Sequence, residues 1–303
     1  MSKICGIGAC VMDTLYEIPS YPAEDTKMRA NGSKPAGGGP VATGLVAAAK
    51  LGANTSFIGN LSDDNGGVFL KKDFEKYGVS TQNTNIISNH RSFSSVIWLC
   101  TDSATRTCVF DRGDLPALEL SKEQLDELES SDLLMVDGNE LEAAITAAKF
   151  MRENGKSVLY DAGGRYAGVE RLLPYADYLI PSKEFALGIT GCQNVQDAAK
   201  KLFEAYSPKV VVITCGKDGG VYYDGKRLLT YPIYPAKVVD SNGAGDVFHG
   251  AFAAGLMRGF DTYKCCHFAS AVSALKCTKV GAREGAPDFD SVKKYMEENS
   301  YEL

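Results

Sequence analysis

The sequence lacks the features that place a protein in or across a membrane. No stretch approaches the roughly 18 uninterrupted apolar residues that a membrane-spanning helix requires. The first residues, Met-Ser-Lys-Ile-Cys-Gly-Ile-Gly, show no cationic region followed by a long apolar core and a cleavage site. These absences predict a cytoplasmic protein with no membrane partner.

Cysteine and positive charge are also arranged in ways that argue against several classes. The nine cysteines form no C-x-x-C pair, and their odd number favours reduced thiols over a disulfide framework or a structural zinc site. The net charge of -6 argues against a nucleic-acid partner, which needs a basic surface. The P-loop signature G-x-x-x-x-G-K-[ST] is absent, which argues against that group of nucleotide-binding enzymes.

What the sequence does contain is a regular alternation of apolar, strand-like runs with helical patterns. The expected strands are residues 3–11, 55–59, 133–136, 157–161, 178–180 and 209–215, and the clearest helices are residues 41–51, 68–77 and 140–154. Strands that alternate with helices of ten or more residues predict βαβ units and a mainly parallel sheet covered on both faces. We therefore predict an α/β fold, with a single domain over residues 1–303.

Two segments, residues 14–34 and 90–112, break this alternation and have no helical period. Within the second, the runs 92–100 and 107–110 alternate like exposed antiparallel strands. We expect the two segments to form a small β-sheet that projects from the core. An exposed edge of this sheet carrying Val96 and Trp98 predicts a homodimer formed through it.

The sharpest chemical signal is the string Asp240-Ser-Asn-Gly-Ala-Gly-Asp246, which leads into an apolar helix. A Gly-Ala-Gly turn at a helix start leaves backbone N–H groups without helical partners, and the positive end of the helix dipole adds to their attraction for an anion. Asp246 then lies in the first turn, where its carboxylate can accept a proton from an attacking alcohol. The plainer interpretation is a tight turn followed by an N-terminal helix acid.

Three motifs together resemble the signatures of the PfkB (ribokinase-like) carbohydrate kinases. The string ending in Asp246 is similar to the family's D-x-x-G-A-G-D-x-F signature, Gly37-Gly-Gly-Pro-Val-Ala-Thr43 to its N-terminal diglycine signature, and Val212-Ile-Thr214-Cys-Gly216-Lys-Asp-Gly219 to its nucleotide loop. The motifs occur in family order and span nearly the whole chain. The resemblance implies a three-layer core with a small β-sheet lid (residues 14–34 and 90–112). It also implies phosphoryl transfer from ATP with Mg²⁺ to a small sugar-like alcohol.

Positions that match the family, together with basic residues near the expected mouth of the site, give a set of candidate residues. They are Asp246 as the base with an anion hole at Gly243, Ala244 and Gly245; Asp13, Lys27, Gly38, Gly39, Thr43, Arg112 and Arg165 for the sugar; Lys183, Thr214, Gly216, Gly219, Asn242, Cys277 and Gly281 for the nucleotide; and Glu184 and Asp240 for metal ions. Arg112 and Arg165 are included because a guanidinium fork suits an anionic group on the acceptor.

The metal assignments follow two features of the resemblance. Many relatives carry an Asn-x-x-Glu stretch near a magnesium-linked water network, where this chain has Ser182 in place of the Asn and Glu184 one position early. Residues 274–285 resemble a loop that flanks the adenine and, in some members, helps to enclose a monovalent cation. The resemblance therefore implies K⁺ as a further cofactor, with Asp240 as its ligand.

The acceptor is less sharply defined than the reaction. The motifs are most similar to those of sulfofructose kinases, in which a lysine at the position of Lys27 holds the anionic end of the substrate, but Phe110 and Asn139 replace other residues of that pocket. A ketose, sugar acid or sulfosugar is favoured. A nucleoside kinase of the same fold and a non-catalytic sugar or nucleotide sensor remain alternatives. An NAD-dependent oxidoreductase is disfavoured, because the strand ending at Phe57-Ile-Gly-Asn60 carries no acid for a ribose.

Overall fold

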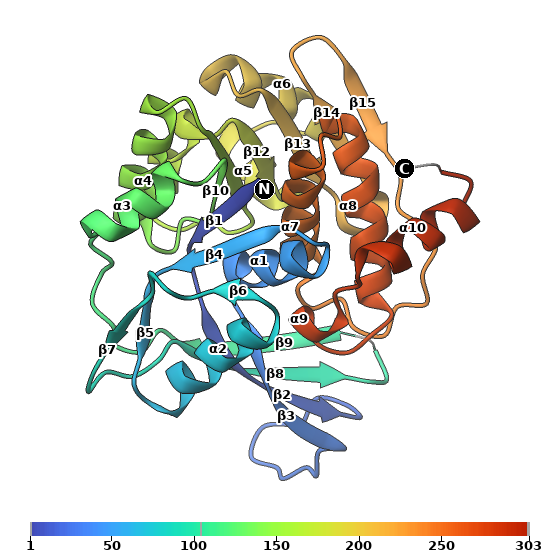
Figure 1. Ribbon diagram of the computed structural model, residues 1–303. Helices are drawn as coiled ribbons and strands as arrows, with labels where there is room; N and C mark the ends of the chain where they lie inside the picture. Colours follow the sequence, from blue (N-terminus) through green and yellow to red (C-terminus); the bar gives the residue numbers. More distant parts are fainter. Residues whose placement is uncertain (1, 104, 302–303) are drawn as a thin grey trace.

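A large β-sheet runs through the middle of the molecule in a computed structural model that describes residues 2–103 and 105–301 (Figure 1). The strand order is β15-β14-β13-β12-β11-β10-β1-β4-β6, and only β14 and β15 run antiparallel to their neighbours. The strands are β1 Lys3–Ile7, β4 Asn54–Ile58, β6 Val79–Ser80, β10 Leu133–Val136, β11 Ser157–Ala162, β12 Tyr178–Pro181, β13 Val210–Thr214, β14 Gly220–Tyr223 and β15 Leu228–Tyr231. The predicted mainly parallel sheet is confirmed. Residues 1, 104, 302 and 303, which the domain and lid predictions include, lie outside the described residues.

Helices cover both faces of this sheet, because successive side chains of a strand point to opposite sides. In β13, Val210 and Val212 join one hydrophobic core cluster, and Val211 and Ile213 join the other. The first cluster is closed by α1 (Pro40–Lys50), α2 (Asn65–Lys76), α7 (Ala244–Met257), α8 (Thr262–Cys277) and α10 (Phe289–Glu298), and the second by α3 (Lys122–Glu129), α4 (Leu141–Glu153), α5 (Lys183–Thr190) and α6 (Val195–Tyr206). The predicted three layers are therefore present.

A second, four-stranded sheet stands beside the core in the order β3-β2-β8-β9 (Figure 1). Its strands are β2 Val11–Ile18, β3 Gly32–Gly38, β8 Ser94–Cys100 and β9 Thr105–Asp111. The small sheet was expected, but the expectation that Val96 and Trp98 form its edge is wrong. They lie in β8, which pairs with β2 on one side and β9 on the other. The edge strands are β3 and β9, and every residue of β9 is exposed.

The expectation of one continuous strand over residues 3–11 is also wrong. The chain leaves the large sheet after Ile7 and enters the small sheet at Val11. The side chain of Asp137 lies at the break: it accepts a hydrogen bond from the N–H of Ala9 (3.0 Å), and a Cβ on Gly8 would overlap it. As a result Asp13 belongs to the small sheet while remaining next to the core.

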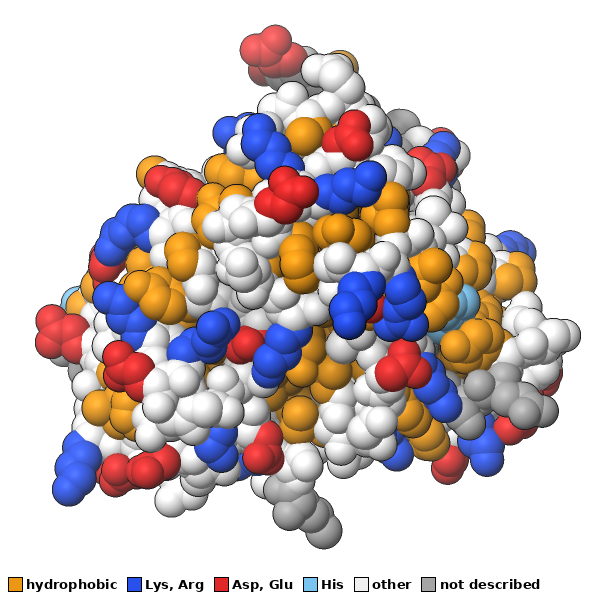
Figure 2. All heavy atoms as spheres, turned by 90° about the horizontal axis from the view of Figure 1, so that it is seen from above, with side chains coloured by type: hydrophobic (Ala, Val, Ile, Leu, Met, Phe, Trp, Pro, Cys, Tyr) orange, Lys and Arg blue, Asp and Glu red, His pale blue; other side chains and the backbone are white. Residues whose placement is uncertain are grey.

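Three short elements lie outside the two sheets and the long helices. Short strands β5 (Asn60–Ser62) and β7 (Asn85–Ile87) form a separate pair, and α9 (Ala282–Gly285) follows α8. On the face shown in Figure 2, basic and acidic side chains intermingle with apolar ones. Within the described residues, no helix combines the length and the apolar character that crossing a membrane would require.

The close packing of α1 against α7 positions the candidate site. A Cβ on Gly250 of α7 would overlap the carbonyl oxygen of Gly44 in α1, so the two helices meet at their glycines. This approach places Thr43 beside the turn that starts α7: a Cβ on Gly243 would lie 3.6 Å from Cγ2 of Thr43. The diglycine segment and the Asp240–Asp246 string, about 200 residues apart, are thereby brought together.

Candidate active site

The start of α7 has the geometry of an anion site. Gly243 immediately precedes the helix with φ 74°, a left-handed conformation that favours glycine. No described side chain caps the helix, so its N-terminal N–H groups point toward the space in front of it. The amide of Ala244 is partly used, since it donates to the carbonyl of Ser241 at 3.2 Å. Asp246 lies in the first turn, beside these donors.

The environment of Asp246 raises its pKa to about 7, mainly because burial disfavours the charged carboxylate. The carboxylates of Asp161 and Asp137 act in the same direction, and His249 and Arg106 oppose them. Asp161 lies in β11 and Asp137 directly follows β10, so both acids stand at the carboxyl ends of parallel strands. A carboxylate that titrates near neutrality is well matched to accept a proton from a hydroxyl group.

His249 and Asp161 form a buried pair beneath this site. Nδ1 of His249 lies 2.6 Å from the carbonyl oxygen of Gly245 and 3.1 Å from Oδ2 of Asp161, and Nε2 lies 2.9 Å from the carbonyl oxygen of Ile180. Both ring nitrogens thus face oxygen acceptors. Oδ2 of Asp161 nevertheless has no hydrogen-bond partner among the described residues. Burial and, more weakly, the nearby carboxylate of Asp137 raise the pKa of Asp161 well above its ordinary value, and burial lowers the pKa of His249.

The sugar-side candidates Asp13, Gly38 and Thr43 are grouped at the junction of the small sheet and α1. Oδ1 of Asp13 accepts a hydrogen bond from the Ser95 hydroxyl at 2.6 Å, and a Cβ on Gly38 would overlap its other carboxylate oxygen. Burial raises the pKa of Asp13 to about 6. The buried hydroxyl of Thr43 has no hydrogen-bond partner among the described residues. Gly39, with φ 94°, precedes α1.

The three cationic candidates for the sugar are not gathered at one point. Arg112 donates to Oδ1 of Asn139 at 2.9 Å and lies over the rings of Phe93 and Tyr166. Arg165 is exposed and lies against α5, where a Cβ on Gly188 would overlap its guanidinium. Lys27 is exposed in the loop between β2 and β3, which projects from the small sheet (Figure 1). Of these three described side chains, Arg112 is the one that contacts a polar residue, Asn139, near the carboxyl ends of the core strands.

The nucleotide-side candidates surround the loops that follow β12 and β13. Thr214 ends β13 and forms a bridge to Ser182, which precedes Lys183 and Glu184 in the first turn of α5. The loop after Thr214 turns at Gly216 and Gly219, both with positive φ.

The remaining nucleotide-side candidates are linked through Asp240. Its carboxylate accepts hydrogen bonds from the N–H groups of Asn242 and Gly281, each at 2.8 Å. Its own N–H donates to the carbonyl of Cys277 at 3.1 Å. This network ties the turn before α7 to the loop after α8.

The residues fit a magnesium ion that arrives on a nucleotide. Glu184 is exposed, and within residues 2–103 and 105–301 no three His, Cys, Asp or Glu side chains are grouped as a metal site. Magnesium usually keeps several waters and binds one or two carboxylates together with substrate phosphates, so a dedicated cage of protein ligands is not required. Asp240 differs as a candidate for K⁺, because both of its carboxylate oxygens already accept backbone hydrogen bonds.

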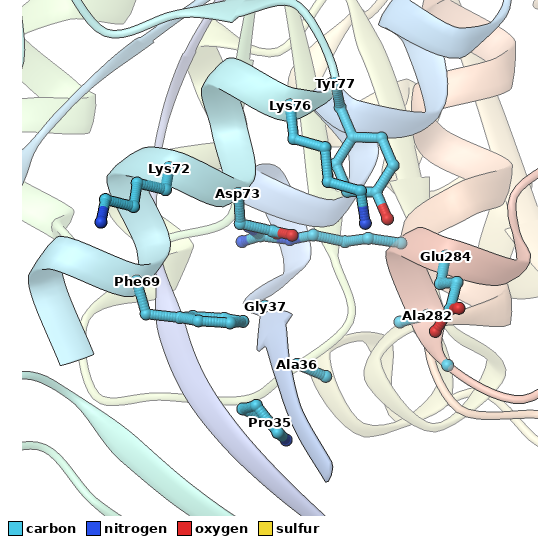
Figure 3. A pocket seen from close by; sticks show the side chains of 12 residues that line it. Pro35, Ala36, Gly37, Phe69, Lys72, Asp73, Lys76, Tyr77, Ala282 and Glu284 are labelled. Carbon is cyan, nitrogen blue, oxygen red and sulfur yellow. The ribbon is translucent and has the colours of Figure 1, made fainter. Parts of the chain in front are cut away.

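Two cavities lie near these groups, and neither contains Asp246. One, of about 240 Å³, lies between β3, α2 and α9 and is lined by Phe69, Asp73, Lys76, Tyr77 and Glu284, among others (Figure 3). It includes Gly37, whereas Asp13 lies beside Gly38, on the opposite face of the strand. A smaller cavity of about 140 Å³ lies between the small sheet and the segment that precedes α7, and Arg106 and Ser241 line it.

Comparison with known proteins identifies the family. Residues 1–288 match the pfkB family carbohydrate kinases. The chain belongs to this family. This carbohydrate kinase is 28% identical to the ribokinase of Lactococcus lactis over 302 residues, which cover 98% of each chain. It is 27% identical to the 5-dehydro-2-deoxygluconokinase of Clostridium perfringens over 297 residues, covering 90% of this chain and 87% of the other.

The fold of the kinase agrees with that of solved relatives. The structure of Arabidopsis thaliana ribokinase complexed with ribose and ATP has a TM-score of 0.87 to it at 25% identity, covering 98% of this chain and 99% of the other. The ribokinase of Thermotoga maritima, at 24% identity, has a TM-score of 0.85. The predicted fold and family are thus confirmed for this kinase.

Several residues of the kinase site were not selected from the sequence. Asp137 and Asp161 carried one available signal, which is their place at the ends of predicted strands. Lys276 and Arg283 are fully buried charges whose partners are distant in the chain, and nothing local marks them as buried. Arg283 donates to Asp73 at 2.8 Å and to the carbonyl of Gly38 at 2.6 Å. It therefore links the end of β3 to α2.

Proposed function

We propose that this carbohydrate kinase transfers the γ-phosphoryl group of ATP to a hydroxyl group of a small sugar, with Asp246 as the general base. The observation that carries the proposal is the position of Asp246 in the first turn of an uncapped helix, directly behind the turn at Gly243. One element thereby offers both a proton acceptor and a set of anion-binding amides. The pKa of about 7 for Asp246 supports the same role.

The acceptor side is assigned to Asp13, Gly38, Gly39 and Thr43. A carboxylate that is buried yet retains accepting capacity can take hydrogen bonds from two sugar hydroxyls, and the bare backbone at Gly38 and Gly39 allows a ring to approach closely. The partnerless hydroxyl of Thr43 is a further polar group that a ligand can satisfy. Relatives named ribokinase and 5-dehydro-2-deoxygluconokinase support a free sugar or a sugar acid as acceptor.

The nucleotide is assigned to the loop at Thr214, Gly216 and Gly219 and to the loop at Cys277 and Gly281. When bound, Mg²⁺ would neutralise charge on the phosphates, and Glu184 would hold its water shell. The small sheet serves as a lid over the sugar and excludes water from the transfer. We further propose a single cytoplasmic kinase domain that forms a homodimer through this sheet.

Each chemical step then falls to a named group. The acceptor hydroxyl, oriented by Asp13, attacks the γ-phosphorus in line as Asp246 accepts its proton. The amides at Gly243 and Gly245 donate to the phosphate oxygens as negative charge shifts onto them. Bringing the hydroxyl, base and phosphate together in this way requires the contact between α1 and α7, since Thr43 and Asp246 come from those two helices.

Release of ADP from Mg-ATP, measured across a panel of acceptors, tests the proposal. The panel contains ketoses, aldoses, sugar acids, sulfosugars and nucleosides, with Asp246→Asn as the paired variant. We expect turnover on one class of sugar and a loss of kcat of about 10²–10⁴-fold in the variant, because the general base is removed.

An exposed acid provides the matched control. Asp126→Asn lies on the surface of α3 and should keep the kcat of the unmodified chain. Near-normal turnover by Asp246→Asn would exclude Asp246 as the base. Turnover on nucleosides alone would favour the nucleoside kinase. Tight ATP binding without turnover of any acceptor would favour a sensor.

A further inference from the structure

The position that the family assigns to a monovalent cation contains a positive charge of the chain itself. The family resemblance implied K⁺ beside Asp240, enclosed by the loop that follows α8. In this chain the side chain of Lys276, in the last turn of α8, is completely buried at that place. Its ammonium donates to the carbonyl oxygen of Asp240 at 2.7 Å and lies 3.7 Å from Oδ2 of the same residue.

Each oxygen atom of Asp240 already accepts a hydrogen bond from the protein. Its carboxylate accepts from the N–H groups of Asn242 and Gly281, and its carbonyl accepts from Lys276. A metal ion binds by replacing its water shell with several oxygen ligands that have free lone pairs. An additional cation next to Lys276 would also experience direct charge repulsion. These residues do not fit a bound K⁺.

The ammonium of Lys276 supplies a positive charge where a bound monovalent cation would supply one. The end of α8 carries the negative end of its helix dipole, which a positive charge stabilises. The ammonium joins this helix to the segment before the anion-hole turn, because its acceptor, Asp240, begins the Asp240–Asp246 string. The N–H of Gly281, in the loop after α8, donates to the carboxylate of the same Asp240. The ammonium thus orders both loops that approach the nucleotide.

We propose that the ammonium of Lys276 permanently replaces the monovalent cation, so that this kinase does not require K⁺. The proposal rests on the proposed function only for its activity readout. Lys276 is a positioning residue, because it acts through Asp240 and the turn at Gly243. A tethered charge is always present, so its effect does not depend on the ionic composition of the medium.

The charges around Lys276 offset the effect of its burial on its pKa. Burial lowers the pKa of Lys276, and the carboxylate of Asp240 opposes that change most strongly, followed more weakly by Cys277 and Asp246. A buried ammonium needs such partners, because an unpaired charge in the interior is strongly disfavoured. Replacement of the side chain should consequently disturb Asp240 first and Asp246 through it.

The test compares the unmodified chain with Lys276→Ala and Lys276→Met in buffers whose only cation is K⁺, NH₄⁺ or tetramethylammonium besides Mg²⁺. The unmodified chain should show the same kcat and KM for ATP in all three. Lys276→Ala opens space for an ion, so its kcat/KM should fall about tenfold or more in tetramethylammonium, and K⁺ or NH₄⁺ should restore it. Lys276→Met fills the space and should not be restored.

A thermal-unfolding series separates this proposal from the proposed function, because it needs no turnover. The midpoint Tm of the unmodified chain should not differ between K⁺ and tetramethylammonium, whereas that of Lys276→Ala should rise with K⁺ concentration, as binding to the folded state requires. Lys279→Ala, an exposed lysine in the same loop, is the matched control and should behave as the unmodified chain.

Two outcomes would overturn the proposal. One is activation, or a rise in Tm, of the unmodified chain by K⁺, which would show that a cation binds despite Lys276. The other is a Lys276→Ala chain that folds and responds to no cation in either measurement. If the variant does not fold, the salt series on the unmodified chain still decides the question.

Discussion

The charged side chains around the site differ sharply between the core and the small sheet. On the core side, Asp161, Lys276 and Arg283 are buried and each faces named polar partners. On the small-sheet side, Arg106 and Lys27 are exposed, and Arg106 lies 3.5 Å from the hydroxyl of Ser241. The core charges are fixed before any ligand arrives, whereas the exposed ones need a ligand to order them.

This difference has energetic consequences that can be measured. Removing one member of a buried ion pair leaves a desolvated charge and typically costs about 3–5 kcal/mol, whereas an exposed pair contributes about 0–1 kcal/mol. Core charges should therefore affect stability and the pKa of the base. Charges on the small sheet should affect the affinity for the acceptor. Three substitutions test this division, beginning with the largest expected effect.

Arg283→Met should lower the free energy of unfolding by about 3–5 kcal/mol. Arg283 is 2% exposed, and its loss leaves Asp73 and the carbonyl of Gly38 without their donor. Urea denaturation, with the midpoint and slope fitted together, measures the change.

The matched control for this change is Arg171→Met. Arg171 also pairs with a carboxylate, that of Glu142, but the two side chains are 52% and 69% exposed. We expect a change below about 1 kcal/mol. Equal effects of the two substitutions would show that burial does not separate the two groups of charges.

Asp161→Asn should move the acid limb of the pH profile of kcat/KM to lower pH. The base must be deprotonated to act, so activity falls as the pH drops through the pKa of Asp246, about 7. The Asp161 carboxylate raises that pKa, and a neutral amide would remove the effect, by about one pH unit. The other titratable or charged groups near Asp246 are Asp137, Arg106 and Lys276 from other elements and His249 from α7 itself, and all of them remain.

An unchanged profile would be equally informative about the pair. It would mean that Asp161, whose pKa burial raises, is already neutral in the unmodified chain, so that Asn only replaces one neutral group by another. The same assay on Asp126→Asn, an exposed acid far from these contacts in α3, should show the original profile.

The features that could be predicted from the sequence are those that depend on residues close together in the chain. The run at 209–215 predicts the buried strand β13 because residues 210–213 are all apolar and β-branched. The turn at Gly243 predicts the start of α7 because glycines and an acid stand at the right spacing. Partners that are distant in the chain leave no such pattern. Arg283 and Asp73 are separated by 210 positions and Lys276 and Asp240 by 36.

The break between β1 and β2 has the same origin. Residues 3–11 look like one apolar strand, and the group that accepts the N–H of Ala9 at the break, Asp137, lies far along the sequence. The prediction that Val96 and Trp98 lie in an edge strand is wrong for a related reason. Their alternation is typical of an exposed strand, yet β9 pairs with that strand on its outer side. The period of apolar residues predicts on which face of a strand a side chain lies, but it does not predict which strand pairs with it.

Arg112→Ala should produce the smallest change and affect the acceptor alone. The side chain is exposed and is held only by Asn139 and by the rings of Phe93 and Tyr166, so the free energy of unfolding should change by less than about 1 kcal/mol. For an anionic acceptor, KM should rise about tenfold while kcat stays near its original value, because a charge-assisted hydrogen bond is lost.

The dependence of KM on ionic strength distinguishes an anionic acceptor from a neutral one in the Arg112→Ala experiment. The contribution of an exposed guanidinium to an anionic sugar should shrink between about 0.01 M and 1 M ionic strength, as the screening length falls from roughly 30 Å to 3 Å. Arg91→Ala, an exposed arginine paired with Asp111 and Asp114 in the same region, should leave KM unchanged at every salt concentration. If Arg112→Ala lowers kcat instead, Arg112 is ordered before the sugar binds, and the small sheet shares the fixed character of the core.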